Sequence, residues 1–179
     1  MVKKMSNFEI ALDKIQGLLE YVFVTVSSLR QNNEFIINLM IEKEKKEFDF
    51  GELTEEEIRH EFNEDEKELI QKSKDIIKTL NKLSEIFTLN EFKDQIYQMD
   101  DIKSVKTGLI LLDKVTDEIY SGEILNLEEI KDETDDIEGK ERLEILIENL
   151  EFLIGKIIDF TVFCSVNLNI DLEDNEDDI

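Results

Sequence analysis

Residues 17–29 read GLLEYVFVTVSSL, and the environment of this apolar stretch decides the fold. It follows a Met-Val-Lys-Lys start, so a membrane-entering segment, a β-strand and the buried face of a helix all compete for it. Glu9, Asp13, Lys14 and Glu20 interrupt the apolar region that a signal peptide or a membrane span requires. We therefore expect no membrane segment here and a cytoplasmic protein.

The spacing of apolar residues around this stretch favours a helix. The segment YVFVTV is rich in β-branched and aromatic residues, which favour strands. From Phe8 to Met40, however, apolar residues recur in steps of three and four, a heptad-like pattern that one buried helix face produces. We predict a helix that runs from Ser6 or Asn7 to the mid-forties. Its stripe comprises Phe8, Leu12, Ile15, Leu19, Val22, Val26, Leu29, Ile36 and Met40, widened by Ala11, Leu18 and Phe23.

A second long helix is predicted to begin at the capping-box pattern Thr54–Glu57 and to end near Phe87. Its apolar stripe is interrupted by Glu66 and Ser73. Because polar residues on a buried face are costly unless they have partners, we expect the segment 62–69 to be weakly packed and half exposed.

Three further segments complete the helical pattern. A short helix is expected over 88–99, and a longer one from Ile102 to about Ser121–Gly122. The acidic stretch EEIKDETDDIEG (128–139) has little helical period and predicts an internal linker. The last helix should bury Leu143, Leu146, Leu150, Leu153, Ile157, Phe160 and Cys164, with Ile147, Ile154 and Ile158 broadening this face.

The segment VNLNIDLE (166–173) has two interpretations. Its strict alternation favours a short extended segment, which could add to the edge of a partner's sheet or pair with EFDF (47–50). Alternatively, it extends the last helix along the bundle. Acidic residues dominate 171–179, which predicts a mobile tail.

Together these patterns predict an all-α fold, an up-and-down bundle of about five to six helices, two or three of them long. Residues 1–170 form a single domain in this prediction. The absence of proline and the presence of only six glycines leave few obligatory helix breaks. The expected core residues are Leu12, Ile15, Leu19, Val22, Val26, Leu29, Leu109, Leu112, Leu146, Leu150, Leu153 and Ile157.

The sequence offers little catalytic chemistry. His60, the only histidine, stands in EIRH, a Glu-x-x-His spacing that di-iron bundles use twice, and no second histidine is present. Cys164 lies on the predicted apolar face, where we expect a buried, inert thiol. The acidic run at 132–138 lacks the glycine and glutamate positions of an EF-hand loop. We expect no enzyme activity, no metal site and no cofactor.

A net charge of −24, most of it in the second half of the chain, argues against direct binding of nucleic acid or of anionic lipid. The favoured function is a non-catalytic interaction module (adaptor, chaperone or assembly subunit) that binds a protein partner or a second copy through apolar helix faces. The alternative is an acidic inhibitor, antitoxin or nucleic-acid mimic that occupies a basic surface. The candidate partner-binding residues are Asp132, Glu133, Asp135, Asp136, Glu138, Leu168, Ile170, Leu172, Glu173 and Asp174.

Overall fold

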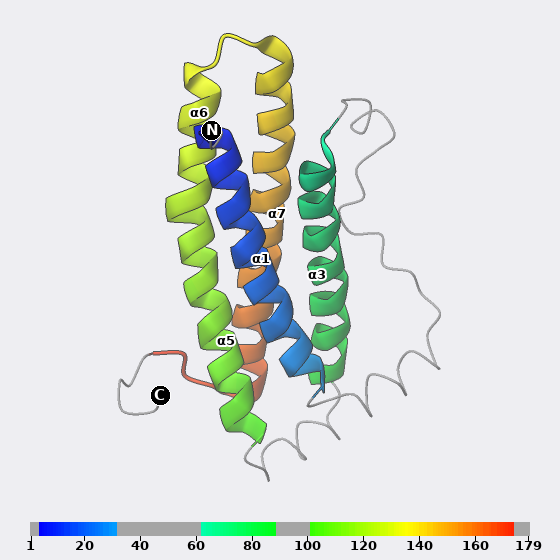
Figure 1. Ribbon diagram of the computed structural model, residues 1–179. Helices are drawn as coiled ribbons and strands as arrows, with labels where there is room; N and C mark the ends of the chain where they lie inside the picture. Colours follow the sequence, from blue (N-terminus) through cyan, green and yellow to red (C-terminus); the bar gives the residue numbers. More distant parts are fainter. Residues whose placement is uncertain (1–3, 32–61, 89–100, 174–179) are drawn as a thin grey trace.

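The computed structural model describes residues 4–31, 62–88 and 101–173, and all regular structure within these ranges is helical (Figure 1). Within these ranges four helical rods pack together: α1 (Asn7–Gln31), α3 (Glu64–Thr88), the continuous rod of α5 (Asp101–Glu118), η2 (Ile119–Ile124) and α6 (Leu125–Glu133), and α7 (Ile137–Leu168). The all-α prediction is confirmed for this part of the chain. The predicted continuation of the first helix, the capping box at 54–57, the short helix over 88–99, His60 and EFDF (47–50) lie outside the described residues.

The first helix begins where the sequence predicted, and a reciprocal capping box fixes this end. The Ser6 amide donates to Glu9 Oε2 (2.7 Å), and the Glu9 amide donates to Ser6 Oγ (3.2 Å). Two amides that a helix N-terminus leaves without intrahelical partners are thereby satisfied.

The core is built from the predicted stripes. All twelve residues expected in the core are buried. Two residues assigned to the edges of these stripes are instead exposed, Phe23 by 48% and Ile158 by 44%. Each lies at the margin of its helix face, where a shift of one position along the sequence turns a side chain by about 100° around the helix.

Among the described helices, α1, α3 and α7 run in the same direction; the residues between α1 and α3 and those between α3 and α5 lie outside the described part of the chain, so the up-and-down arrangement stays a prediction. Contacts of α3 with α7 join Glu66 to Arg142 and Ser73 to Asn149, at a constant sequence separation of 76, which is a parallel arrangement. Figure 1 shows α1 running the same way, from the end marked N. Within ranges 4–31, 62–88 and 101–173, the α5–η2–α6 rod runs antiparallel to α1, α3 and α7.

The rod from α5 to α6 corrects two predictions, because it neither ends at Ser121–Gly122 nor gives way to a linker over 128–139. It continues to Glu133, and only residues 134–136 separate it from α7. Ile124 and Leu127 are fully buried, so the apolar face persists past Gly122 and through the acidic stretch. Acidic residues on the solvent side of a helix do not interrupt it.

Of residues 166–173, the first three continue α7, as the helix-extension interpretation predicts, and residues 169–173 follow the helix end without regular structure. The helix continues to Leu168, and Asn169 adopts a left-handed conformation (φ 51°). The Ile170 amide then donates to the Ser165 carbonyl (3.0 Å), and Ser165 Oγ donates to the Ile170 carbonyl (2.9 Å). This is the geometry of a Schellman-type helix end, in which Asn replaces the more frequent Gly.

The polar interruptions in α3 are buried, whereas residues 63–65, 67 and 68 are exposed, as the prediction of a half-exposed segment expects. Glu66 and Ser73 are both 0% exposed, and Phe62 is also buried. Arg142 forms an ion pair with Glu66, in which Arg142 Nε donates to Glu66 Oε2 (3.2 Å). The Asn149 side-chain amide donates to Ser73 Oγ. Partners on α7 therefore offset part of the cost of burying these groups.

Candidate interaction surfaces

The predicted acidic candidates gather at one end of the bundle, around the turn between α6 and α7 (Figure 1). Two of them end α6, two lie in the three-residue turn, and one opens α7. All five side chains are exposed: Asp132, Glu133, Asp135, Asp136 and Glu138. The structure thus brings these carboxylates together on a short connection between two helices, not on a long linker.

The C-terminal candidates lie at the opposite end of α7, and two of them are unsuited to partner binding. Leu168 is 0% exposed and Ile170 is 7% exposed, since the helix end folds them onto the core. Leu172 is half-buried against the core and Glu173 is exposed. Asp174 lies outside the described residues. The predicted apolar patch at 168–172 is therefore mostly part of the hydrophobic core.

The outward face of α7 changes character along its length, a feature that the sequence analysis missed. In the first half this face carries the exposed carboxylates of Glu144, Glu148 and Glu151. In the second half it carries exposed apolar side chains at Ile158 (44%), Val162 (55%) and Val166 (73%). These six positions recur at intervals of three, four and seven residues and so share one side of the helix.

Two further residues border the apolar half of this face. Gly155 stands where the acidic half gives way to the apolar half, and no atom lies within 4 Å of the position that a Cβ would take there. Phe152 is 40% exposed, and Lys156 Nζ lies 5.5 Å from the centroid of its ring. A partner backbone can therefore approach α7 closely at Gly155.

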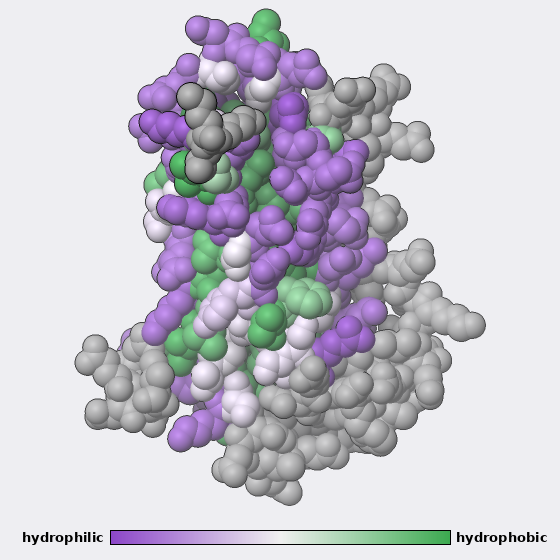
Figure 2. Space-filling view, viewed as in Figure 1, coloured by the Kyte–Doolittle hydropathy of each residue, from purple (hydrophilic) through white to green (hydrophobic). Residues whose placement is uncertain are grey.

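A second surface lies between α1 and α5. Figure 2 shows hydrophilic side chains over the upper part of the visible face and apolar or weakly polar ones lower down, over α1 and α5. A groove of about 960 Å³ lies between these helices. None of the described residues that line it is acidic; they include Tyr21, Val24, Ser28, Lys103, Thr107 and Leu111. This groove therefore carries no acidic side chain and one basic side chain, Lys103, on a strongly acidic chain.

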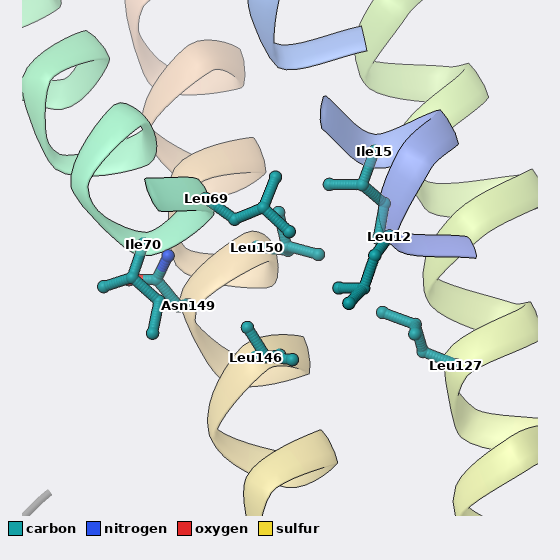
Figure 3. Close-up of a pocket in the computed structure, with 8 residues that line it drawn as sticks. All are labelled: Leu12, Ile15, Leu69, Ile70, Leu127, Leu146, Asn149 and Leu150. Carbon is teal, nitrogen blue, oxygen red and sulfur yellow. The ribbon is translucent and has the colours of Figure 1, made fainter. Parts of the chain in front are cut away.

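The interior between the helices is closed. Leu12 and Ile15 of α1, Leu127 of α6 and Leu150 of α7 meet in the centre (Figure 3), and their side chains leave no space for a water molecule. Asn149 lies on the α3 side of this group, beside Ile70 (Figure 3). This region is packed core and not a ligand site.

Candidate reactive groups are sparse in the part of the chain that the structure describes. Cys164 is fully buried, and burial raises the pKa of its thiol far above the usual range, as expected for an inert cysteine. Within ranges 4–31, 62–88 and 101–173, no three histidine, cysteine or acidic side chains converge in a way that could hold a metal ion. No helix in these ranges combines the length and the apolar character of a membrane span.

Comparison of the chain with protein-family models, with curated proteins and with solved structures found no match. No relative therefore assigns a role to any of the residues above.

Proposed function

We propose that this chain is a non-catalytic interaction module, acting as an adaptor, chaperone or assembly subunit, that binds a protein partner along the outward face of α7. The observation that carries the proposal is the division of this face into an acidic half (Glu144, Glu148, Glu151) and an apolar half (Ile158, Val162, Val166). Apolar surface gains about 25 cal/mol per Å² when a partner covers it. A contiguous exposed row of branched side chains is typical of an interaction site.

The chemistry of this face defines the partner. An amphipathic helix fits it if apolar residues cover Ile158, Val162 and Val166 while Lys or Arg residues at its other end reach the three glutamates. The open backbone at Gly155 allows close approach midway. A second copy fits less well, because it would bring together two chains of net charge −24.

The test compares baits that differ only on this face. Val162→Glu combined with Val166→Glu makes the apolar half acidic. Tyr120→Glu combined with Leu125→Glu is the matched control, because these side chains are 52% and 47% exposed on η2 and α6. We expect the wild type and the control to retain a partner from native-cell extract that the α7 variant loses by at least tenfold.

The retained protein then has to show the stated chemistry. Its binding segment, made as a synthetic peptide, should be a basic amphipathic helix. Replacing Glu144, Glu148 and Glu151 with Gln should weaken its affinity and reduce the salt dependence of binding. Equal retention by the α7 variant would place the interface elsewhere. A dimer in sedimentation that the α7 variant abolishes would assign the face to a second copy instead.

A second candidate function rests on the acidic turn. We propose as the alternative that its five carboxylates occupy a basic groove of a partner, as an inhibitor, antitoxin or nucleic-acid mimic would. The five carboxylates lie at helix ends and in a short turn, which hold them at more constant distances from one another than a long linker would. This supports the alternative, since mimicry of a nucleic acid requires charges at fixed spacing. The chain should then displace labelled DNA from a basic DNA-binding protein at low salt. Replacing Asp132, Asp135 and Asp136 with Asn should abolish displacement, and no displacement by the wild type would exclude this function.

A further inference from the structure

A buried carboxylate lies where the π-helix η2 faces α1. The side chain of Glu123 is only 8% exposed, and its Oε1 lies 3.7 Å from Lys14 Nζ. Its second oxygen, Oε2, is buried without a hydrogen-bond partner. A buried acceptor left without a donor destabilises the fold. Lys14 therefore pairs with only one of the two carboxylate oxygens of Glu123.

The backbone around Glu123 is also unusual. The six residues Ile119–Ile124 form a π-helix inside an otherwise regular helical rod. Such π turns widen the helix by one residue and occur frequently at functional sites. At Gly122, and at Gly17 on the facing side of α1, a Cβ would meet no atom within 4 Å apart from the adjacent residues and the backbone of its own helix. The wide turn and these glycines leave space beside the carboxylate.

This space is a hollow of about 520 Å³, which we name the π-turn hollow. Its volume is that of a pocket for a small molecule. Two carboxylates (Glu118 and Glu123) and one ammonium group (Lys14) line it, so its charge favours a cation. Its remaining lining residues are Gly17, Leu18, Ser121 and Gly122.

We propose that the π-turn hollow binds a small cationic ligand through an alkyl-guanidinium or alkyl-ammonium group. The Glu123 carboxylate accepts an N–H of this group in place of the Lys14 ammonium, and Glu118 adds negative charge at the rim. The Lys14 side chain is 61% exposed, so it can swing towards solvent and open the approach to Glu123. Lys14 thus competes with the ligand for the same carboxylate. The hollow is separate from the outward face of α7, and the proposal does not depend on the function proposed above.

The test uses agmatine, which carries both cationic groups, and follows backbone amides by nuclear magnetic resonance. Gly17 and Gly122 report on the hollow, and Gly155, an equally open glycine on α7, is the internal control. The titration is run at about 0.15 M salt, where the Debye length is about 8 Å and diffuse attraction of cations to the acidic chain is screened. We expect saturable shifts at Gly17 and Gly122, none at Gly155, and none anywhere with acetate in place of agmatine.

Three variants test in which direction each side chain changes the affinity for agmatine. Glu123→Gln should weaken agmatine binding at least tenfold, whereas Glu129→Gln, which removes an exposed acid of α6, should leave it unchanged. Lys14→Met should strengthen binding, because the competing ammonium is gone. Circular dichroism checks that each variant is folded.

Three outcomes would overturn the proposal. Shifts that do not saturate, or that appear equally at Gly155, would show only diffuse attraction to acidic surface. Unchanged binding by Glu123→Gln would remove the carboxylate from the site. Loss of binding in Lys14→Met would show that Lys14 supports the ligand and does not compete with it.

Discussion

The side-chain amide of Asn149 donates a hydrogen bond to the Ser73 hydroxyl, one heptad along the α3–α7 interface from the pair in which Arg142 holds Glu66. Two polar pairs at the same sequence separation fix how α3 lies against α7. Sliding one helix by a turn would break both pairs and leave a buried carboxylate without its guanidinium. Polar groups at such positions specify register in coiled coils.

The Asn149–Ser73 hydrogen bond should therefore be measurable as a coupling. We expect Asn149→Ala to lower the free energy of unfolding by about 1–3 kcal/mol, because Ser73 Oγ loses its donor and a gap remains. The double variant with Ser73→Ala should cost less than the sum of the single variants, by about 0.5–1.5 kcal/mol. Urea denaturation of the four proteins measures this difference, and strict additivity would show that the hydrogen bond contributes nothing.

Glu66 should make stability depend on pH. Burial raises the pKa of its carboxyl above the ordinary value of 4.5, and the Arg142 guanidinium offsets this only in part. The folded state thus binds the Glu66 proton more tightly than the unfolded state does. The stabilisation of the folded state that protonated Glu66 provides is fully present below about pH 4.5. It is lost as the pH rises through the raised pKa.

The wild type and Glu66→Gln are compared by their free energies of unfolding at each pH. The titration of all other acidic residues is common to both proteins and cancels in the difference. The free energy of unfolding of the wild type minus that of the variant should fall as the pH rises above about 4.5. A difference that grows over this range would mean that Arg142 outweighs burial.

Packing in the core predicts a contrast between two residues of α7. Leu150 is 3% exposed, so Leu150→Ala should cost about 2–5 kcal/mol. Ile158 is 44% exposed, and Ile158→Ala should change stability by less than about 0.5 kcal/mol. Chemical denaturation of both variants provides the check. Similar losses at the two positions would place Ile158 inside the bundle.

Two helical glycines should respond to alanine with opposite signs. A Cβ at Gly108 would lie 2.6 Å from Leu29 Cδ2, and Leu29 is itself buried, so Gly108→Ala should cost about 1–3 kcal/mol through overpacking. Gly155 has open space around it, and Gly155→Ala should add about 0.5–1 kcal/mol through helix propensity. Melting temperatures of the two variants should therefore move in opposite directions. An increase for Gly108→Ala would mean that α1 and α5 can separate at this point.

The Cys164 thiol should be inert in the folded protein. Burial raises its pKa, so very little thiolate is present near neutral pH. Iodoacetamide should label it at least a hundredfold faster in denaturant than in buffer, as followed by mass spectrometry. Comparable rates would show that the end of α7 opens readily.

The buried stripes could be predicted from the sequence because apolar period is a local property of each helix. Leu19 and Leu150 were placed correctly for this reason. The partners of Glu66 and Ser73 could not be predicted, because they lie on another helix 76 residues away. Without those partners, both residues resemble interruptions of an exposed helix.

The candidate surfaces were predicted less well. The exposed acidic turn follows from composition, but its shortness follows from Ile124 and Leu127, which keep α6 packed against the core. The alternation at 166–172 suggested a strand, whereas a single left-handed residue, Asn169, turns the chain after a helix. The apolar half of the α7 face was hidden in the sequence, since Ile158, Val162 and Val166 resemble further core residues.

The direction of the helices has an electrical consequence. Peptide dipoles sum along each helix to about half a positive charge at its N-terminus, and antiparallel neighbours cancel one another. Of the helices that the structure describes, α1, α3 and α7 run one way and the α5–η2–α6 rod runs the other, so their dipoles sum to roughly one positive charge at the end where the three begin. The carboxylates of the turn between α6 and α7 lie at that end, where this residual field stabilises them.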